Sequence, residues 1–141
     1  MNVYPSDDHK AAFVRLARGS DLLQGLTEAA QKLGLEAATV QAIGAVDGLT
    51  VAFFEPEEKE YAPIRFEEHY EITSSLGNVS LKDGQPFVHV HVTASDRQGR
   101  VMGGHLLEGT TVFMIEAYFR ALGGEPPVRE REEDLGLAVW R

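Results

Sequence analysis

Three of the five histidines fall within seventeen residues, at positions 89, 91 and 105. Residues 87–93, around the first two, are rich in β-branched and aromatic side chains and are typical of a strand. Side chains alternate between the two faces of a strand, so His89 and His91 lie on the same face. If His105 joins them, three neutral imidazoles form a site suited to Zn²⁺, with a fourth position left for water or a ligand; Ni²⁺, Cu²⁺ and Fe²⁺ also accept such ligands.

The turn after this strand decides whether His105 joins the pair. Residues 97–99 predict a three-residue hairpin loop that ends on Gly99 in the left-handed conformation. This register places His91 directly opposite His105, with Cβ atoms about 5 Å apart. A loop of two or four residues would turn His105 to the opposite face, and a bulge at Gly103–Gly104 would restore or spoil the register. The spacing therefore predicts a three-histidine site on one face of a hairpin, provided that the loop has three residues.

Length and composition narrow the class of protein. The chain has 141 residues, of which 43% are hydrophobic, and this predicts one globular domain over residues 1–141. Without cysteine there is neither a disulfide framework nor a thiolate metal site. No apolar run has the length of a membrane span, and the first residues lack the charged-then-apolar order of a signal peptide. We therefore expect a cytoplasmic protein that has no membrane partner.

The net charge of −9 argues against nucleic-acid binding. Nucleic-acid-binding proteins draw most of their affinity from neutralised phosphates and usually carry a basic patch, whereas the basic residues here form no dense cluster. Acidic residues dominate two segments, 55–60 and 130–134, which we expect to be solvated loops. The long-range field of such a chain would repel DNA, although a local patch assembled by folding could still bind it.

Hydrophobic periodicity predicts one clear helix. Apolar residues recur at helical spacing over residues 22–33, where Ser20 or Asp21 would cap the start and Gly34 the end. A strand is expected before this helix, at residues 12–18, and several strands are expected after it. These later strands are predicted at residues 37–46, 49–54, 65–75, 79–81, 87–93, 110–120 and 137–140.

Short turns connect the predicted strands. Asp47-Gly48 is a hairpin signal between two apolar runs, and residues 76–78 are expected to form a turn. Residues 123–127 contain two glycines and two prolines that end the strand before them, and a polar segment follows. Many strands, short turns and one helix predict an α+β fold, in which a mainly antiparallel sheet packs against one or two helices.

Four segments carry a resemblance to a known family. They are residues 42–54 (AIGAVDGLTVAFF), 70–78 (YEITSSLGN), 87–91 (FVHVH) and 103–106 (GGHL). In this order they resemble the plants-and-prokaryotes-conserved (PPC) domain, in its free-standing prokaryotic type, and the likeness runs from about residue 14 to residue 140. The resemblance implies a curved antiparallel sheet and a homotrimer.

The same resemblance bears on the site and on the partners. In prokaryotic members with the three-histidine pattern, it implies a divalent metal at the positions of His89, His91 and His105, and we expect this metal to be zinc. Free-standing members have been described provisionally as DNA-binding proteins. In plants the domain is attached to an AT-hook that contacts DNA, and the present sequence has no such Arg-Gly-Arg-Pro motif.

Three functions are compatible with these expectations. The first is a trimeric metal-binding protein that binds an unknown small ligand or acts in regulation. The second is a DNA-binding transcriptional regulator, which the charge of −9 disfavours. The third is a metal-dependent enzyme of unspecified reaction. Its general base would be Glu71, Glu108 or Glu116, chosen by residue type alone, and Glu116 either faces solvent or lies toward the core or a subunit boundary.

The other notable residues have structural interpretations. We expect His9 to be solvated, and His69 to be a partnered polar group unless its strand lies beside the histidine hairpin. Trp140 is expected to anchor the end of the chain in the core or in a subunit interface. The interface residues expected in a trimer, or their neighbours on the opposite strand face, are Phe113, Ile115 and Phe119.

Overall fold

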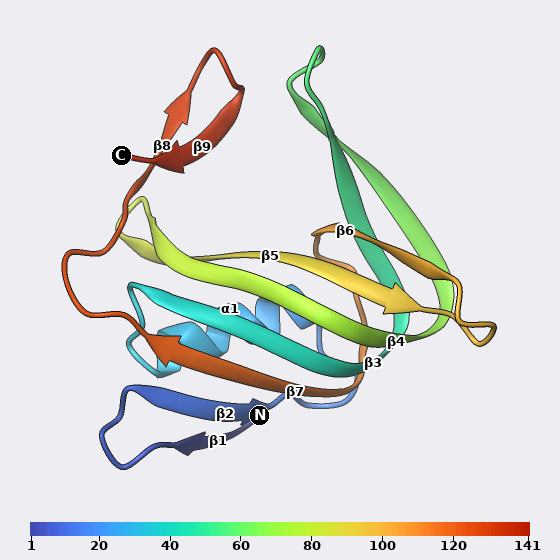
Figure 1. Cartoon of the computed structure of the whole chain (residues 1–141), viewed down its shortest axis with the longest axis horizontal. Helices are drawn as coiled ribbons and strands as arrows, with labels where there is room; N and C mark the ends of the chain where they lie inside the picture. Colours follow the sequence, from blue (N-terminus) through green and yellow to red (C-terminus); the bar gives the residue numbers. More distant parts are fainter.

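A single antiparallel sheet of seven strands dominates the computed structural model, which describes residues 1–141 (Figure 1). Its strands, in spatial order, are β1 (Asn2–Pro5), β2 (Ala11–Arg15), β7 (Val112–Ala121), β3 (Ala38–Glu55), β4 (Glu60–Lys82), β5 (Gln85–Ser95) and β6 (Val101–Leu106). A separate hairpin contains β8 (Arg129–Glu132) and β9 (Leu137–Trp140), and α1 (Leu22–Lys32) is the one helix. The mainly antiparallel sheet is confirmed, and the fold has more β-structure than the α+β prediction implied.

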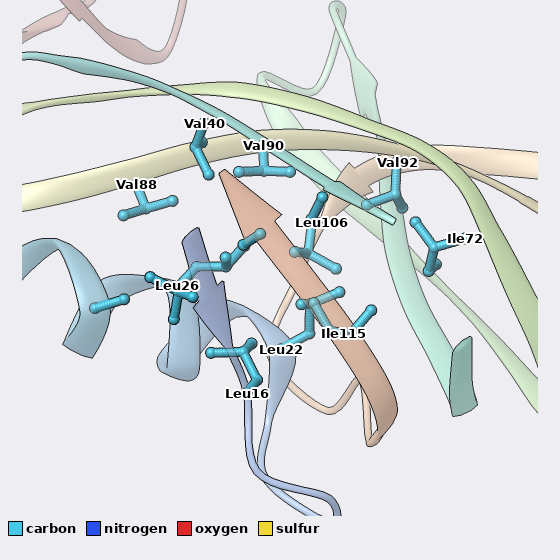
Figure 2. Packing of buried hydrophobic residues seen from close by; sticks show 14 of the residues in the cluster. Leu16, Leu22, Leu26, Val40, Ile72, Val88, Val90, Val92, Leu106 and Ile115 are labelled. Atoms are coloured by element: carbon cyan, nitrogen blue, oxygen red, sulfur yellow. The ribbon is translucent and has the colours of Figure 1, made fainter. Parts of the chain in front are cut away.

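Helix α1 covers one face of the sheet and forms the core with it. Its buried Leu26 lies toward Val88 of β5, and its buried Leu22 lies beside Ile115 of β7 (Figure 2). Each fully buried side chain of this size contributes about 1.5–3 kcal/mol. The alternation in β5 buries its valines against the helix, so the histidines between them point to the other face. No helix of the protein has the length and apolar character that crossing a membrane requires.

The predicted helix boundaries are confirmed. The Oδ1 atom of Asp21 accepts a hydrogen bond of 2.9 Å from the backbone N–H of Gln24, which makes Asp21 the N-cap. Gly34 follows the helix with a φ of +64°, a conformation that glycine adopts without strain. The cap also serves the rest of the fold, because Oδ2 of Asp21 accepts a hydrogen bond from the backbone N–H of Gly109 in the connection before β7.

The predicted hairpin at Asp47-Gly48 is wrong, because β3 runs unbroken through it. Gly48 has a φ of +93°, and the pairing with β4 shifts register between Asp47 and Leu49. A bulge, like a tight turn, often requires a glycine with a positive φ, so the Asp47-Gly48 pair resembled a hairpin turn. The true β3–β4 turn lies within the first acidic segment, at residues 56–59, whose side chains are exposed as predicted, whereas Glu55 and Glu60 belong to the strands.

The predicted turn at residues 76–78 is also wrong, because β4 is continuous there. Gly77 pairs with Val40 on one side and Val90 on the other. A Cβ atom at Gly77 would lie 2.2 Å from the carbonyl oxygen of His89, so this glycine permits a close approach of two strands. The chain turns instead at Asp83-Gly84, where φ is +53° and +73°, a pattern typical of two-residue hairpins.

The ends of the chain contain two strands that the sequence did not predict. Strand β1 precedes the predicted first strand, which is β2 and ends at Arg15 rather than residue 18. Strand β8 forms the start of the second acidic segment, so residues 130–132 are paired and are not a loop. Both strands are short, and both contain charged or turn-forming residues that mask a period of two.

The second half of β3 gives the sheet its curvature. Its first half pairs with β4 and β7, whereas Val51 and Ala52 pair with Leu106 and His105 of β6. The strands β3, β4, β5 and β6 therefore curl toward a closed ring. Beyond this ring the ends of β3 and β4 project as a long hairpin, residues 53–62, which we call the arm (Figure 1).

Candidate metal centre

The β5–β6 hairpin has the three-residue loop that its sequence predicted. His91 pairs with His105, and the register continues without a shift to Ser95 and Val101. Gly99 has a φ of +76°, as required at the end of such a loop. The alternatives with another loop length or with a bulge at Gly103–Gly104 are therefore wrong.

The register brings three imidazole rings together on the sheet face opposite to α1. The ring centroids of His89 and His105 are 4.9 Å apart, those of His89 and His91 5.2 Å, and those of His91 and His105 5.4 Å. One nitrogen atom of each ring lies within 4.8 Å of the others. His91 is exposed, whereas the other two rings are half-buried. The shared strand face and the pairing of His91 with His105 account for this convergence.

Two of these rings have buried nitrogen atoms without a hydrogen-bond partner. They are Nε2 of His89 and Nδ1 of His105, which with the hydroxyl of Ser75 are the buried side-chain polar atoms left unpaired. A buried polar atom without a partner costs about 1–3 kcal/mol and calls for an explanation. Coordination to a metal would satisfy both nitrogen atoms, so these residues fit a divalent ion.

The electrostatic surroundings keep the two half-buried rings neutral. Burial lowers the pKa of His89 to about 4, with further lowering by the positive charge of Arg129 and by His91. Burial likewise lowers the pKa of His105 to about 4, helped by the neighbouring histidines and Arg129. A neutral imidazole keeps one nitrogen lone pair, which is the form that binds a metal.

Arg129, from β8, lies directly beside the histidines. Its Nη2 is 3.4 Å from Nδ1 of His89 and 3.0 Å from Oδ1 of Asn78. Its Nε donates to the hydroxyl of Ser80 at 2.8 Å, and Nη1 donates to the carbonyl of Ala138 at 3.0 Å. These contacts fix the guanidinium at the site and attach the C-terminal hairpin to β4.

Aromatic rings enclose this guanidinium. It lies 5.1 Å from the ring centroid of Phe87 and 5.5 Å from that of Trp140. Burial lowers the pKa of Arg129, and no carboxylate forms an ion pair with it. Trp140 is 51% exposed and contacts Arg129, so it does not lie in the core; its placement in a subunit interface stays a prediction.

The arm supplies another wall of the site. The ring of Tyr61 stacks on His105 with centroids 4.4 Å apart and an interplanar angle of 23°. Burial raises the pKa of this tyrosine.

At the tip of the arm, Nζ of Lys59 donates a 2.8 Å hydrogen bond to the carbonyl of Glu133 in the C-terminal hairpin. The two hairpins rise side by side in Figure 1, and the space between them and the histidines is a cavity of about 840 Å³, which we call the chamber.

The predicted candidate bases lie elsewhere. Glu71 and Glu116 are exposed and do not line the chamber, and Glu108 accepts a hydrogen bond from Gln24 beside the helix. His69 also lies apart from the three histidines, although its strand β4 pairs with β5. Its Nδ1 is 2.8 Å from Oδ1 of Asp47, so the interpretation as a partnered polar group is confirmed.

The predicted interface residues divide between the core and the surface. Ile115 and Phe119 are fully buried within the chain, so they are wrong as interface residues. Phe113 is 38% exposed and contacts His69 and Arg18. The predicted alternative, the opposite face of β7, remains exposed at Met114.

Two residues of the site, Arg129 and Tyr61, were not predicted from the sequence. Each follows an acidic or proline-containing segment that looks like a solvated loop, and each reaches the histidines only through long-range packing. No local pattern distinguishes Arg129 from the other scattered basic residues. The one available signal was the apolar run at residues 137–140, which predicted a final strand but not its partner.

A curled antiparallel sheet with one helix, and with three imidazoles on its open face, defines a small β-rich domain with a candidate metal centre. A family model described as the Plants and Prokaryotes Conserved (PCC) domain matches residues 5–122. The chain belongs to this family, as its sequence motifs indicated. The C-terminal hairpin that contains Arg129 lies beyond the matched residues.

Solved structures of similar proteins agree with this assignment. A metal-containing protein from Archaeoglobus fulgidus is 38% identical, with a TM-score of 0.89 and coverage of 100% of this chain and 99% of that one. A plant- and prokaryote-conserved (PPC) protein from Pyrococcus horikoshii is 39% identical, with a TM-score of 0.88 and coverage of 93% and 90%. A protein from Bacteroides thetaiotaomicron, provisionally named as DNA-binding, shares the fold at 24% identity, with a TM-score of 0.90 and coverage of 99% and 96%.

One curated relative is a much longer protein. The bifunctional protein GlmU of Synechococcus sp. (strain JA-3-3Ab) is 32% identical over 114 residues, which are 80% of this chain. The chain spans only 16% of the length of that relative. The likeness therefore concerns one segment of a larger protein.

Proposed function

We propose that this protein holds one divalent metal ion, zinc, at His89, His91 and His105, and that it binds a small ligand at the metal for a binding or regulatory task. The two buried, unpaired imidazole nitrogens carry the proposal, because a metal is the partner that such neutral groups lack. The similarity to an archaeal protein described as metal-containing supports it. When bound, the ion would supply a Lewis acid with an open coordination position.

Ligand binding is favoured over catalysis by the composition of the chamber. None of the predicted general bases lines it, and the groups nearest to the histidines are an arginine and a tyrosine. An arginine cannot act as a base, and burial raises the pKa of Tyr61. The residues that surround the histidines are suited to holding a ligand rather than to removing a proton from it.

We further propose that the protein assembles as a homotrimer. The outer face of the sheet exposes large apolar side chains with no cover within the chain, including Tyr4, Phe13 and Ile43. Together with Tyr118 they line an apolar hollow of about 470 Å³ that is separate from the histidines. Exposed apolar surfaces of this kind are typical of protein interfaces. Light scattering after gel filtration should give about three times the 15.5 kDa mass of the chain, and a stable monomer would contradict this proposal.

Metal analysis of untagged protein tests the main proposal. We expect about one zinc ion per chain in the wild type and a loss of metal in His105→Ala, with the fold retained because backbone pairing forms the hairpin. The control is His69→Ala, since this histidine lies outside the cluster and should leave the metal content unchanged. Equal metal content in the wild type and in a His89→Ala, His105→Ala double variant would exclude the proposed site.

A further inference from the structure

The interior of the chamber carries positive charge that no acidic group compensates. Three neutral imidazoles would leave the charge of +2 on a bound ion uncompensated, whereas carboxylate or thiolate ligands would neutralise part of it. Arg129 adds a further positive charge 3.4 Å from His89, and it takes part in none of the protein's ion pairs. A half-buried cation beside a dication is unfavourable unless an anion joins them.

The acidic residues of the chamber do not meet this need. They stand at its exposed rim, together with an equal number of basic residues, so that the charges of the rim balance. The rim carboxylates are Glu60, Asp83 and Glu130, and the rim cations are Lys59, Lys82 and Arg131. The uncompensated charge is therefore that of Arg129 at the inner wall, next to His89.

We propose that the chamber binds a small anion, a carboxylate or phosphate group, which takes the open position of the metal and is held by Arg129. This inference rests on the proposed metal site and names the class of its ligand. Guanidinium groups bind both anions through planar, charge-assisted hydrogen bonds. The cavity of about 840 Å³ has room for a small organic molecule that carries such a group.

The contact between Arg129 and His89 couples the two binding events. A guanidinium can only donate hydrogen bonds, so Nδ1 of His89 accepts and its proton lies on Nε2 in the metal-free protein. With a metal at Nε2, the remaining ring proton of His89 would lie on Nδ1, which could then not accept; with a metal at Nδ1, the N–H group of Arg129 would lose its acceptor directly. Either way, metal binding releases an N–H group of Arg129. That N–H group is the one available to the anion.

The variant Arg129→Ala separates this role from a structural one. We expect metal affinity to rise by about threefold or more, because a repelling charge and a competing donor are removed. We expect anion affinity to fall roughly 10- to 100-fold, as for the loss of a charge-assisted hydrogen bond. An arginine that merely fixes the hairpin to Asn78 and Ser80 would lower both affinities when removed.

Cobalt-substituted protein provides both readouts. Competition with a chelating dye measures metal affinity, and visible absorption of the bound Co²⁺ reports titrations with acetate and, separately, with inorganic phosphate. The two anions distinguish a carboxylate site from a phosphate site. The matched control is Arg120→Ala, which removes the same charge from an exposed position of β7 that does not line the chamber. It should change neither affinity by more than about twofold.

Three results would contradict the anion site. An unchanged cobalt spectrum with both anions, in protein that binds metal, would overturn the anion site and leave the proposed metal function intact. Protein that binds no metal would overturn both. If circular dichroism shows that Arg129→Ala does not fold, Arg129→Lys takes its place. This variant keeps the positive charge but loses the planar guanidinium group. An undiminished anion affinity in Arg129→Lys would exclude the role assigned to Arg129.

Discussion

At the scale of single residues, burial explains the state of the histidine cluster. The hairpin places the rings of His89 and His105 at the base of the chamber, where both are half-buried. Burial is the first cause of the lowered pKa of both rings, and the charge of Arg129 acts in the same direction. Both rings therefore bind a metal near pH 7 without first losing a proton.

The metal-free protein should lose stability as the pH falls from about 7 to 4. The pKa of His89 and of His105 is about 4 in the folded chain, against an ordinary value of 6.5 that the unfolded chain retains. Between these values the unfolded chain binds protons that the folded chain does not, so the free energy of unfolding falls with the pH. Below about pH 4 both states are protonated, and the two rings add no further slope. Urea denaturation over a series of pH values measures the effect.

Two variants isolate the contribution of the cluster from that of the carboxylates, which titrate in part of the same window. Replacing both rings, with His89→Gln and His105→Gln, should make the decline shallower. Replacing the exposed His9 by glutamine should leave the slope as it is in the wild type. The same slope in the double variant and the wild type would show that these two rings do not cause the decline.

At the scale of elements, the sequence predicted what depends on neighbouring residues. The register of His91 against His105 depends on a loop of three residues, and the helix depends on its own cap and periodicity. The errors at Asp47-Gly48 and at residues 76–78 have one physical cause. A glycine serves a bulge or a close approach of strands as readily as a turn, and only the partner strand distinguishes these uses.

Gly77→Ala should destabilise the fold through the strand that supports the site. The added Cβ would lie 2.2 Å from the carbonyl oxygen of His89 and 2.6 Å from a methyl group of Val90, so β4 and β5 must separate. We expect the free energy of unfolding to fall by about 1–3 kcal/mol, and metal affinity to fall with it because His89 moves. Urea denaturation and dye competition measure the two effects. The control Gly123→Ala, where a Cβ meets nothing within 4 Å, should stay within about 0.5 kcal/mol of the wild type. An unaltered stability for Gly77→Ala would disprove the close-approach interpretation.

At the scale of the whole molecule, the chamber could not be predicted from the sequence. Its walls combine the arm, the histidine hairpin and the C-terminal hairpin, which come from distant parts of the chain. The pairing of β3 with β6 and the contact of Lys59 with Glu133 depend on the curvature of the entire sheet. Local patterns carry no information on such packing, so the ligands were predicted and their surroundings were not.

The distribution of charge over the whole molecule bears on DNA binding. Two arginines, Arg97 and Arg100, lie close together in the turn of the histidine hairpin, but they form only a weak basic patch. Nε of Arg100 lies 2.6 Å from Oδ2 of Asp96, so that this cation is paired within its own turn. Each cation of the chamber rim is next to a carboxylate in the sequence, as in Lys59-Glu60, Lys82-Asp83 and Glu130-Arg131.

We therefore expect duplex DNA to bind weakly or not at all. The net charge of −9 on each chain opposes approach to a polyanion, and assembly into a trimer would increase the opposing charge. Fluorescence anisotropy with duplex DNA at about 0.15 M salt should show no sub-micromolar binding, in metal-loaded and metal-free protein alike. A known DNA-binding domain titrated under the same conditions serves as the positive control. Tight binding that weakens steeply with added salt would reverse this conclusion, because this salt dependence indicates that several phosphates are neutralised. DNA rather than a small anion would then be the principal partner.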